Sequence, residues 1–442
     1  MPLGLYISVP FCRTKCSYCN FASDVFSKSA HENYIARLVE DIGNARQLAS
    51  RLGASLDETA DSIYLGGGTP SILDASQLRR IFAAARGQFA VTSDAEITVE
   101  CAPGTLTSAL IETLLQCGVN RVSLGVQSFV DREAQSVGRL HKRSTVLGEI
   151  GRLRDGGLVN ISIDLIAGLP HQTAESWALS LSEVIATGVP HVSVYMLEVD
   201  DDSRLGRELI AGGARYHAHF VPNDDATADF YQQACETLDA AGVAQYEISN
   251  FARCESHSQN CELHSYKSQH NLRYWTRQPY FGFGVDAHSM LEPLVERLVS
   301  LRRAQGRLSS VRVGTAVGDM AADRHRAVRF ATPDSLDAYM NRKPPTVTLV
   351  SAQAAIEEAF FLGLRLNRGI DLEQSRNDFG PEAVAVQETA IQQCVGDGLL
   401  EQPGTILRLT ARGRLLSNEV FTRFLANKPE ETKVGTGHVN PR

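Results

Sequence analysis

Residues 10–21 read Pro-Phe-Cys-Arg-Thr-Lys-Cys-Ser-Tyr-Cys-Asn-Phe, which sets Cys12, Cys16 and Cys19 in a C-x3-C-x2-C arrangement. Three thiolates at this spacing can hold three irons of a 4Fe–4S cluster and leave the fourth iron without a protein ligand. The alternatives are unrelated buried cysteines or a zinc site, but zinc would normally take a fourth Cys or His close by in such a loop. The spacing therefore predicts a cubane cluster with one open iron, as a chelating cofactor requires.

Working outward from this loop, short apolar runs alternate with longer amphipathic stretches. This alternation predicts βαβ units and a parallel sheet. The α/β fold we expect is a partial (β/α)6 barrel of the TIM type, in which chemistry takes place at the carboxyl ends of the strands. The predicted strands are 3–9, 62–65, 96–99, 121–125, 160–166 and 191–197, and the predicted helices are 30–52, 74–88, 108–117, 142–155 and 175–187.

Unusual polar residues and glycines fall at the ends of these predicted strands. Each could be an ordinary loop or capping residue, but six such positions on one rim indicate a binding site. They are Cys12, residues 66–70, Glu100, Gln127, Asp164 and Glu198.

Residues 66–70 read Gly-Gly-Gly-Thr-Pro. Without side chains, the backbone of such a loop can approach a ligand and hydrogen-bond its amino group. Ordinary turns also use glycine triplets, so this loop gains meaning from its place after a strand and downstream of the cysteines. The two motifs together resemble the radical S-adenosylmethionine (SAM) superfamily.

Further segments resemble the branch of that superfamily that contains oxygen-independent coproporphyrinogen III dehydrogenase. The resemblance is close over residues 3–290 and looser beyond. It rests on residues 96–104, 118–129, 138–141, 164–172 and 246–253.

The resemblance implies two groups of SAM-binding residues. Positions matching Tyr6, Gly67, Glu100 and the cysteine loop contact SAM on the cluster. Other positions line the SAM pocket or a second SAM site, and these match Tyr18, Gly68, Thr69, Gln127, Arg139 and Asp164.

These assignments agree with the chemistry of the side chains. Glu100 and Asp164 can accept hydrogen bonds from ribose hydroxyls or an amino group. Arg139 can bind a carboxylate through two hydrogen bonds, although a surface ion pair is an alternative for this residue.

Two departures from the dehydrogenase are typical of the HemW-like heme chaperones. Phe21 stands where the dehydrogenase has a fourth cysteine, and the first cluster cysteine is already residue 12, without the long preceding segment of the dehydrogenase. Residues 270–275, His-Asn-Leu-Arg-Tyr-Trp, resemble the H-N-x-x-Y-W motif of those chaperones.

The resemblance implies heme as cargo. His270 could bind heme iron through a neutral imidazole, with Tyr274 and Trp275 facing the macrocycle. The alternative is that these residues only close the open side of the barrel.

The leading hypothesis is a heme chaperone that binds heme and a SAM-liganded 4Fe–4S cluster. It would deliver heme to membrane-associated respiratory proteins and would need an electron donor; monomer and homodimer both stay open. The second hypothesis is the dehydrogenase itself, an activity that we expect to be absent. A third, a scaffold that keeps the cluster for structure alone, is disfavoured by the glycine loop and Glu100.

The composition bounds the class of protein. The chain has 442 residues, a formal net charge of -8 and no long run of Lys and Arg, which argues against nucleic acid as a partner. No apolar stretch approaches the roughly 20 residues that span a bilayer, and residues 1–11 lack the basic start of a signal peptide. We expect a cytoplasmic protein, with any membrane contact peripheral.

Four segments are expected: a radical SAM barrel over 1–290, a connector over 291–350, a winged-helix-like α+β domain over 351–427, and a disordered tail over 428–442. The third would contain helices over 352–366 and 381–394, a hairpin with its turn at residues 403–404, and a last helix capped by Thr410. The pattern of Cys254, His257, Cys261 and His264 is interpreted as an incidental insertion, because its spacing matches no standard zinc finger.

Overall fold

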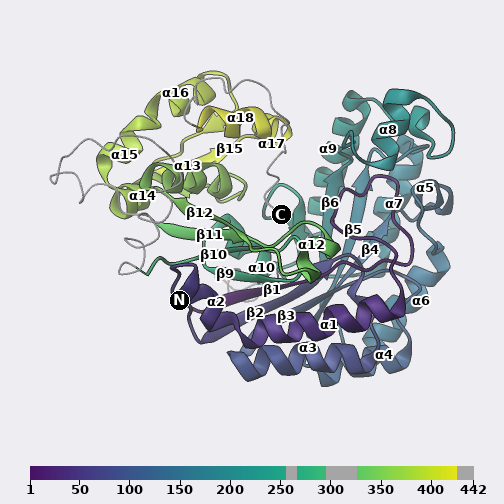
Figure 1. The fold of residues 1–442 in the computed structure, drawn as a ribbon. Coiled ribbons are helices and arrows are strands. Elements are labelled where there is room, and N and C mark those ends of the chain that lie inside the picture. Colours follow the sequence, from purple (N-terminus) through teal and green to yellow (C-terminus); the bar gives the residue numbers. More distant parts are fainter. Residues whose placement is uncertain (255–265, 295–325, 426–442) are drawn as a thin grey trace. The chain divides into compact units, whose positions relative to one another are not determined.

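The computed structural model describes residues 1–254, 266–294 and 326–425, and the chain divides between Ala352 and Gln353 into two compact units (Figure 1). The described residues of the first unit contain a 12-stranded sheet, and those of the second contain a 3-stranded sheet. Three of the sequence-based predictions fall on residues outside the described ones. They concern His257, Cys261 and His264, residues 295–325 of the connector, and the tail over 428–442.

The first unit is built on parallel strands that pair in chain order. They are β1 (Leu3–Val9), β2 (Thr59–Gly67), β3 (Ala90–Cys101), β4 (Arg121–Gln127), β5 (Ile161–Ala167) and β6 (His191–Met196). β1 lies between β2 and β9 (Tyr280–Phe283), whereas β6 lies between β5 and β8 (Asn250–Ala252). The arc β1–β6 is therefore open, and the predicted partial (β/α)6 barrel is confirmed.

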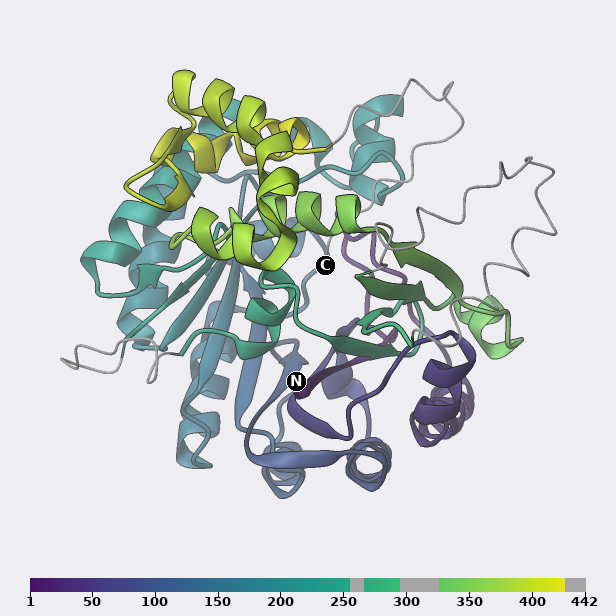
Figure 2. The ribbon, with the colours of Figure 1, turned by 90° about the vertical axis from the view of Figure 1, so that its left-hand side faces the viewer.

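Helices cover the outer side of this arc (Figure 2). The local sequence explains where they begin: α3 starts with a capping box between Asp74 and Gln77, and α7 with one between Thr173 and Ser176. These helices and their neighbours are α1 (Lys28–Gly43), α2 (Ala45–Arg51), η1 (Pro70–Ile72), α3 (Ala75–Gln88), α4 (Ser108–Gln116), α5 (Asp131–Ser136), α6 (Arg143–Asp155) and α7 (Ala174–Thr187).

The chain after β6 forms helices and then both edges of the sheet. The helical elements are α8 (Arg204–Ala211), η2 (Ala218–Phe220), α9 (Asp224–Ala240), α10 (Gln269–Trp275) and α12 (Leu336–Met340). The antiparallel edge strands are β7 (Ala244–Gln245), β8, β10 (His288–Leu291), β11 (Ala327–Ala331) and β12 (Thr346–Val350).

The expected connector over 291–350 differs from the described residues there. β11 pairs with β10, and β12 with β11, so residues 327–331 and 346–350 extend the main sheet, with α12 between them. Val328 and Phe330 alternate inward and are buried, a strand signal that the Arg-rich composition of the surrounding segment obscured.

The second unit has mixed helices and strands, as expected for a winged-helix-like domain. Its sheet order is β13–β15–β14. The predicted helix 381–394 is divided into two helices, the last helix breaks at Leu416, and α14 was not predicted. The elements are α13 (Ala352–Gly363), β13 (Ile370–Asp371), α14 (Leu372–Phe379), α15 (Pro381–Val386), α16 (Glu388–Gly396), β14 (Leu400–Glu401), β15 (Ile406–Leu409), α17 (Ala411–Leu415) and α18 (Ser417–Arg423).

Candidate functional site

The cysteine loop follows β1 and is anchored to distant parts of the first unit. The Cys12 N–H donates to the Asp24 carbonyl at 3.0 Å. Ser17 uses both backbone groups: its N–H donates to the Val137 carbonyl at 3.1 Å, and its C=O accepts from the Leu205 N–H at 2.8 Å. These bonds shape the loop independently of any cofactor.

The three thiols lie in surroundings that suit an iron–sulfur cluster. Cys16 is buried, Cys12 and Cys19 are partly buried, and burial raises the pKa of the latter two thiols. Thiolates in such a place need nearby positive charge, which cluster irons supply. Two donors already point at sulfur: the Thr69 hydroxyl at 3.6 Å from Cys12 Sγ, and Arg139 Nη1 at 3.6 Å from Cys16 Sγ.

A cluster and a single metal ion require different arrangements of their ligands. Among them, no set of three His, Cys, Asp or Glu side chains is placed to hold one ion. A cubane does not need such convergence, because each thiolate binds a different iron. The partly buried to buried Cys12, Cys16 and Cys19 are therefore compatible with the predicted cluster.

The glycine loop is hydrogen-bonded to the backbone that leads into the cysteine loop. The Gly68 N–H donates to the Val9 carbonyl at 2.9 Å, and the Thr69 N–H to the Phe11 carbonyl at 2.7 Å. A Cβ at Gly68 would lie 2.7 Å from both of these oxygens, which is closer than real Cβ contacts. Gly67 has φ +99°, a conformation that favours glycine. The triplet thus serves a close backbone approach.

Glu100, at the end of β3, connects this loop to the barrel interior. Its carboxylate accepts from the Tyr64 hydroxyl at 2.9 Å and from the Gly67 N–H at 3.2 Å. The ring of Tyr6 stacks on that of Tyr64 with a centroid separation of 6.2 Å. The structure therefore brings Tyr6, Gly67 and Glu100 together, as the resemblance implied.

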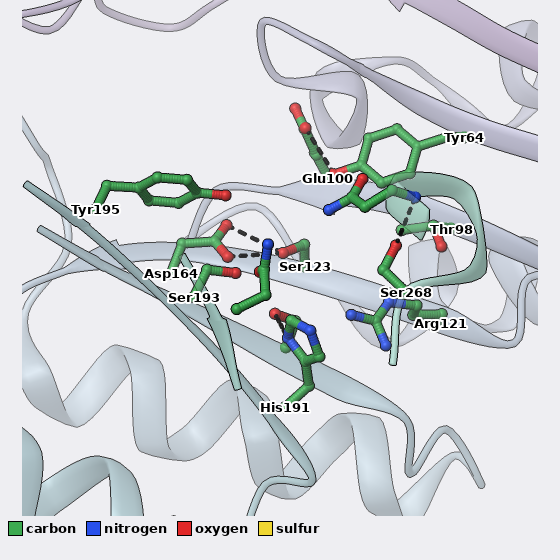
Figure 3. A pocket seen from close by; sticks show the side chains of 13 residues that line it. Tyr64, Thr98, Glu100, Arg121, Ser123, Asp164, His191, Ser193, Tyr195 and Ser268 are labelled. Atoms are coloured by element: carbon green, nitrogen blue, oxygen red, sulfur yellow. Dashed lines mark hydrogen bonds between the residues drawn. The ribbon is translucent and has the colours of Figure 1, made fainter. Parts of the chain in front are cut away.

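A polar cavity of about 50 Å³ opens inside the barrel, and Figure 3 shows its side chains around a common space. Asp164 lies there and accepts from the Ser123 hydroxyl at 3.0 Å through both carboxylate oxygens. Burial raises the pKa of Asp164, although the hydroxyls of Ser193 and Ser123 oppose the shift.

Several lining residues of this cavity were missed by sequence reasoning. The available signal was strand alternation, since every second residue of a barrel strand faces inward. This alternation would have predicted Ser123 on β4 and His191, Ser193 and Tyr195 on β6. The missed side chains are Tyr64, Thr98, Arg121, Ser123, Ser162, His191, Ser193, Tyr195, Asn250, Ser268 and Asn271.

Gln127 and Arg139 lie together over Gly125. A Cβ at Gly125 would lie 3.0 Å from Gln127 Nε2 and 2.9 Å from Arg139 Nη2. Gln127 follows a strand irregularity and has φ +68°, a strained backbone that often marks functional sites. Arg139 donates to the Gly125 carbonyl and to Cys16 Sγ, so its contacts are with the rim. This disfavours the surface ion pair that was the alternative.

Tyr18 lies away from the cavity lining, on an apolar cluster. It packs with Leu197 against Val137, Ile166 and Leu169. The structure thus places Tyr18 as a support of the cysteine loop, and its role toward SAM stays a prediction.

His270 is buried and hydrogen-bonded at both ring nitrogens. Nδ1 lies 3.0 Å from Ser62 Oγ, and Nε2 lies 2.8 Å from the Tyr274 hydroxyl. The backbone N–H of His270 donates to the Glu96 carboxylate at 3.0 Å. Burial, with a smaller effect of Arg273, lowers the imidazole pKa to about 3. The ring is therefore neutral, and its hydrogen bonds are structural.

Comparison with known proteins identifies the family. The model of the radical SAM superfamily matches residues 6–184, and that of the HemN C-terminal domain matches residues 350–416. The chain is 30% identical over 424 residues to the heme chaperone HemW of Lactococcus lactis, covering 96% of this chain and 97% of the relative. The chain belongs to the HemW family.

Other members and a solved structure agree with this membership. The HemW of Bacillus subtilis is 30% identical over 423 residues, covering 95% of this chain and 98% of the relative. The structure of coproporphyrinogen III oxidase (HemN) from Escherichia coli, a radical SAM enzyme, superposes with a TM-score of 0.72 at 21% identity, covering 96% and 90% of the two chains. This chain thus has the fold of that HemN structure, and the predicted resemblance is confirmed.

Within the part of the chain that the structure describes, no helix combines the length and the apolar character that a bilayer crossing requires.

Proposed function

We propose that this HemW-family protein is a heme chaperone, which binds heme and a SAM-liganded 4Fe–4S cluster and delivers heme to membrane-associated respiratory proteins. The observation that carries the proposal is the likeness, over nearly the whole chain, to proteins named heme chaperones. The proposal includes a cytoplasmic location, peripheral membrane contact and an external electron donor.

Cys12, Cys16 and Cys19 would hold the cluster, whose bound form supplies one-electron reducing power and an open iron for SAM. Their surroundings support this assignment, since Thr69 and Arg139 donate to two of the sulfurs. Such donors stabilise the negative charge on the ligands.

Glu100 and Asp164 would bind SAM on the inner side of the rim. Glu100, at the end of β3, accepts a hydrogen bond from the Gly67 N–H of the glycine loop, so it can also accept from the amino group or ribose of SAM while Gly67 holds it in place. Ser123 orients Asp164 toward the same cavity. The two carboxylates would position the cofactor.

A direct experiment separates the chaperone from a porphyrinogen enzyme. Anaerobically reconstituted protein is incubated with coproporphyrinogen III, SAM and a reductant, and separately titrated with heme. We expect no protoporphyrinogen and a saturable Soret band at one heme per chain. Robust protoporphyrinogen formation would overturn the chaperone proposal, and so would the absence of saturable heme binding.

The assignment of His270 as the iron ligand stays a prediction with a structural condition. Iron could bind Nε2 only after the Tyr274 hydroxyl leaves it, and the ring would have to become accessible from its buried position.

A further inference from the structure

A second pocket, of about 570 Å³, lies beyond the carboxyl ends of β5 and β6. Its walls come from the chain after β6, from α8, from η2 and from the start of α9. The apolar part of the lining includes Leu197, Val199, Leu209, Val221 and Pro222, and His219 lies on the same wall. This volume is in the range of cavities that take small-molecule and cofactor ligands.

The wall that carries His219 is held in place by hydrogen bonds of the protein itself. The buried carboxylate of Glu208 accepts from the N–H groups of Tyr216 at 2.8 Å and Ala218 at 3.2 Å. The N–H of His171 donates to the Phe220 carbonyl at 3.0 Å, which ties η2 to the loop after β5. The pocket is thus formed before any ligand enters.

The histidines near this pocket differ in their hydrogen bonds. His171 Nε2 and His217 Nδ1 lie 3.3 Å apart, and His171 Nδ1 lies 3.2 Å from Arg132 Nη2. The exposed ring of His219 makes no hydrogen bond to any described residue. His219 therefore offers an imidazole nitrogen to a ligand, whereas both ring nitrogens of the buried His270 are already engaged.

We propose that this pocket binds the heme cargo and that His219 is an axial ligand of its iron. This inference rests on the heme-chaperone function proposed above. An imidazole beside an apolar surface meets the two needs of a heme site, a nitrogen for the iron and an apolar wall for the macrocycle.

The charges of the pocket set the orientation of the heme. Glu198 and Asp224 also line it, and their carboxylates would repel the heme propionates. The propionates therefore point away from these carboxylates toward solvent, whereas Leu209, 55% exposed, belongs to the apolar wall. An exposed edge of this kind suits a cargo that is passed on.

The pocket is also connected to the cysteine loop. Leu197, from the pocket wall, and Tyr18, from between Cys16 and Cys19, pack against the same apolar cluster. A displacement of that loop on binding the cluster or SAM would therefore shift the packing of Leu197 in the pocket wall.

The test is a heme titration of the full-length protein and of five variants, followed by Soret absorbance and by the low-spin signal in electron paramagnetic resonance. H219A should lose the wild-type Soret position and bind heme at least tenfold more weakly. L209E, which places a charge on the apolar wall, should also weaken binding. The control H288A, which removes an exposed imidazole elsewhere, should retain the wild-type spectrum, and H270A compares the two candidate iron ligands directly.

The outcomes separate the two proposals. A wild-type protein without saturable heme binding would refute the chaperone function. Wild-type binding that H219A leaves unchanged, or that only H270A abolishes, would refute this pocket alone. Because His219 and Leu209 are exposed, circular dichroism should show both variants folded, and the conservative L209M should bind like the wild type.

Discussion

The rim around the cysteines and the base of the barrel around His270 contain similar polar side chains but use them differently. At the rim, Cys12, Cys16 and Glu100 accept hydrogen bonds from neighbouring donors. At the base, His270 and Tyr274 are bonded to each other and to the strands. The difference teaches that a motif indicates a ligand site only where its polar atoms are not already used by one another.

The strongest test of this comparison removes a rim ligand. Cys16→Ala should abolish the cluster, reducing iron from about four per chain to a trace, because two thiolates do not hold a cubane stably. The check is iron and sulfide analysis with visible absorbance after anaerobic reconstitution. The matched control is Cys101→Ala, a buried cysteine at the end of β3, which should keep its iron. Normal iron content in Cys16→Ala would mean that the rim cysteines do not hold the cluster.

The next largest effect concerns SAM. Glu100→Gln should weaken SAM binding by about 10- to 100-fold, since hydrogen bonds to a charged group contribute about 1.5–3 kcal/mol. Isothermal titration of the reconstituted protein measures it. Tyr64→Phe, which removes only a neighbour of that carboxylate, should cost less than tenfold. Equal losses in both variants would mean that Glu100 acts only through packing.

The base should respond in stability rather than in cofactor binding. The pKa of His270 is about 3 when folded and about 6.5 when unfolded, so the unfolded chain binds the proton first. Stability from the neutral ring is complete above pH 6.5 and is lost as the pH falls toward 3. Between pH 7 and pH 5 this residue should cost about 2 kcal/mol of unfolding free energy.

Urea unfolding of the wild type and of His270→Gln at both pH values measures that contribution. The variant should lose about 2 kcal/mol less than the wild type over this interval, and it should reconstitute a normal cluster. Identical pH dependence of the two proteins would contradict a buried neutral imidazole.

The smallest expected effect is at Thr69. Thr69→Val removes the hydroxyl that donates to Cys12 Sγ and should lower the cluster reduction potential, because a hydrogen bond to sulfur favours the reduced, more negative cluster. A net gain of under about 1 kcal/mol corresponds to a shift of under about 40 mV for one electron. A redox titration followed by electron paramagnetic resonance detects it. Thr69→Ser should retain the wild-type potential, and an upward shift in Thr69→Val would contradict the assigned donor.

Local patterns predicted most of the first unit because they are written in adjacent residues. The strand 3–9 and the helices near 74–88 and 108–117 follow from periodicity and caps such as Asp74. The break at Asn44, which divides the predicted helix 30–52, directly follows Gly43, a local signal that the periodicity of the apolar residues outweighed.

The site was predictable where residue types have few other uses, as with three close cysteines. It was not predictable where the deciding partner is distant in sequence. Ser62 contacts His270 across 208 positions, and Glu96 binds the same segment across 174 positions. Only the folded chain shows that this histidine is already satisfied.

The position of β1 has a consequence for how the protein is made. This strand lies between β2 and β9, yet β9 is synthesised roughly 270 residues later. At a translation rate of about 5–20 residues per second, one edge of β1 stays unpaired for about 15–55 seconds before β9 is synthesised. An unpaired strand edge can pair with the wrong strand or with another chain. The nascent chain, with its cysteine loop beside that edge, should therefore depend on molecular chaperones until translation passes Phe283.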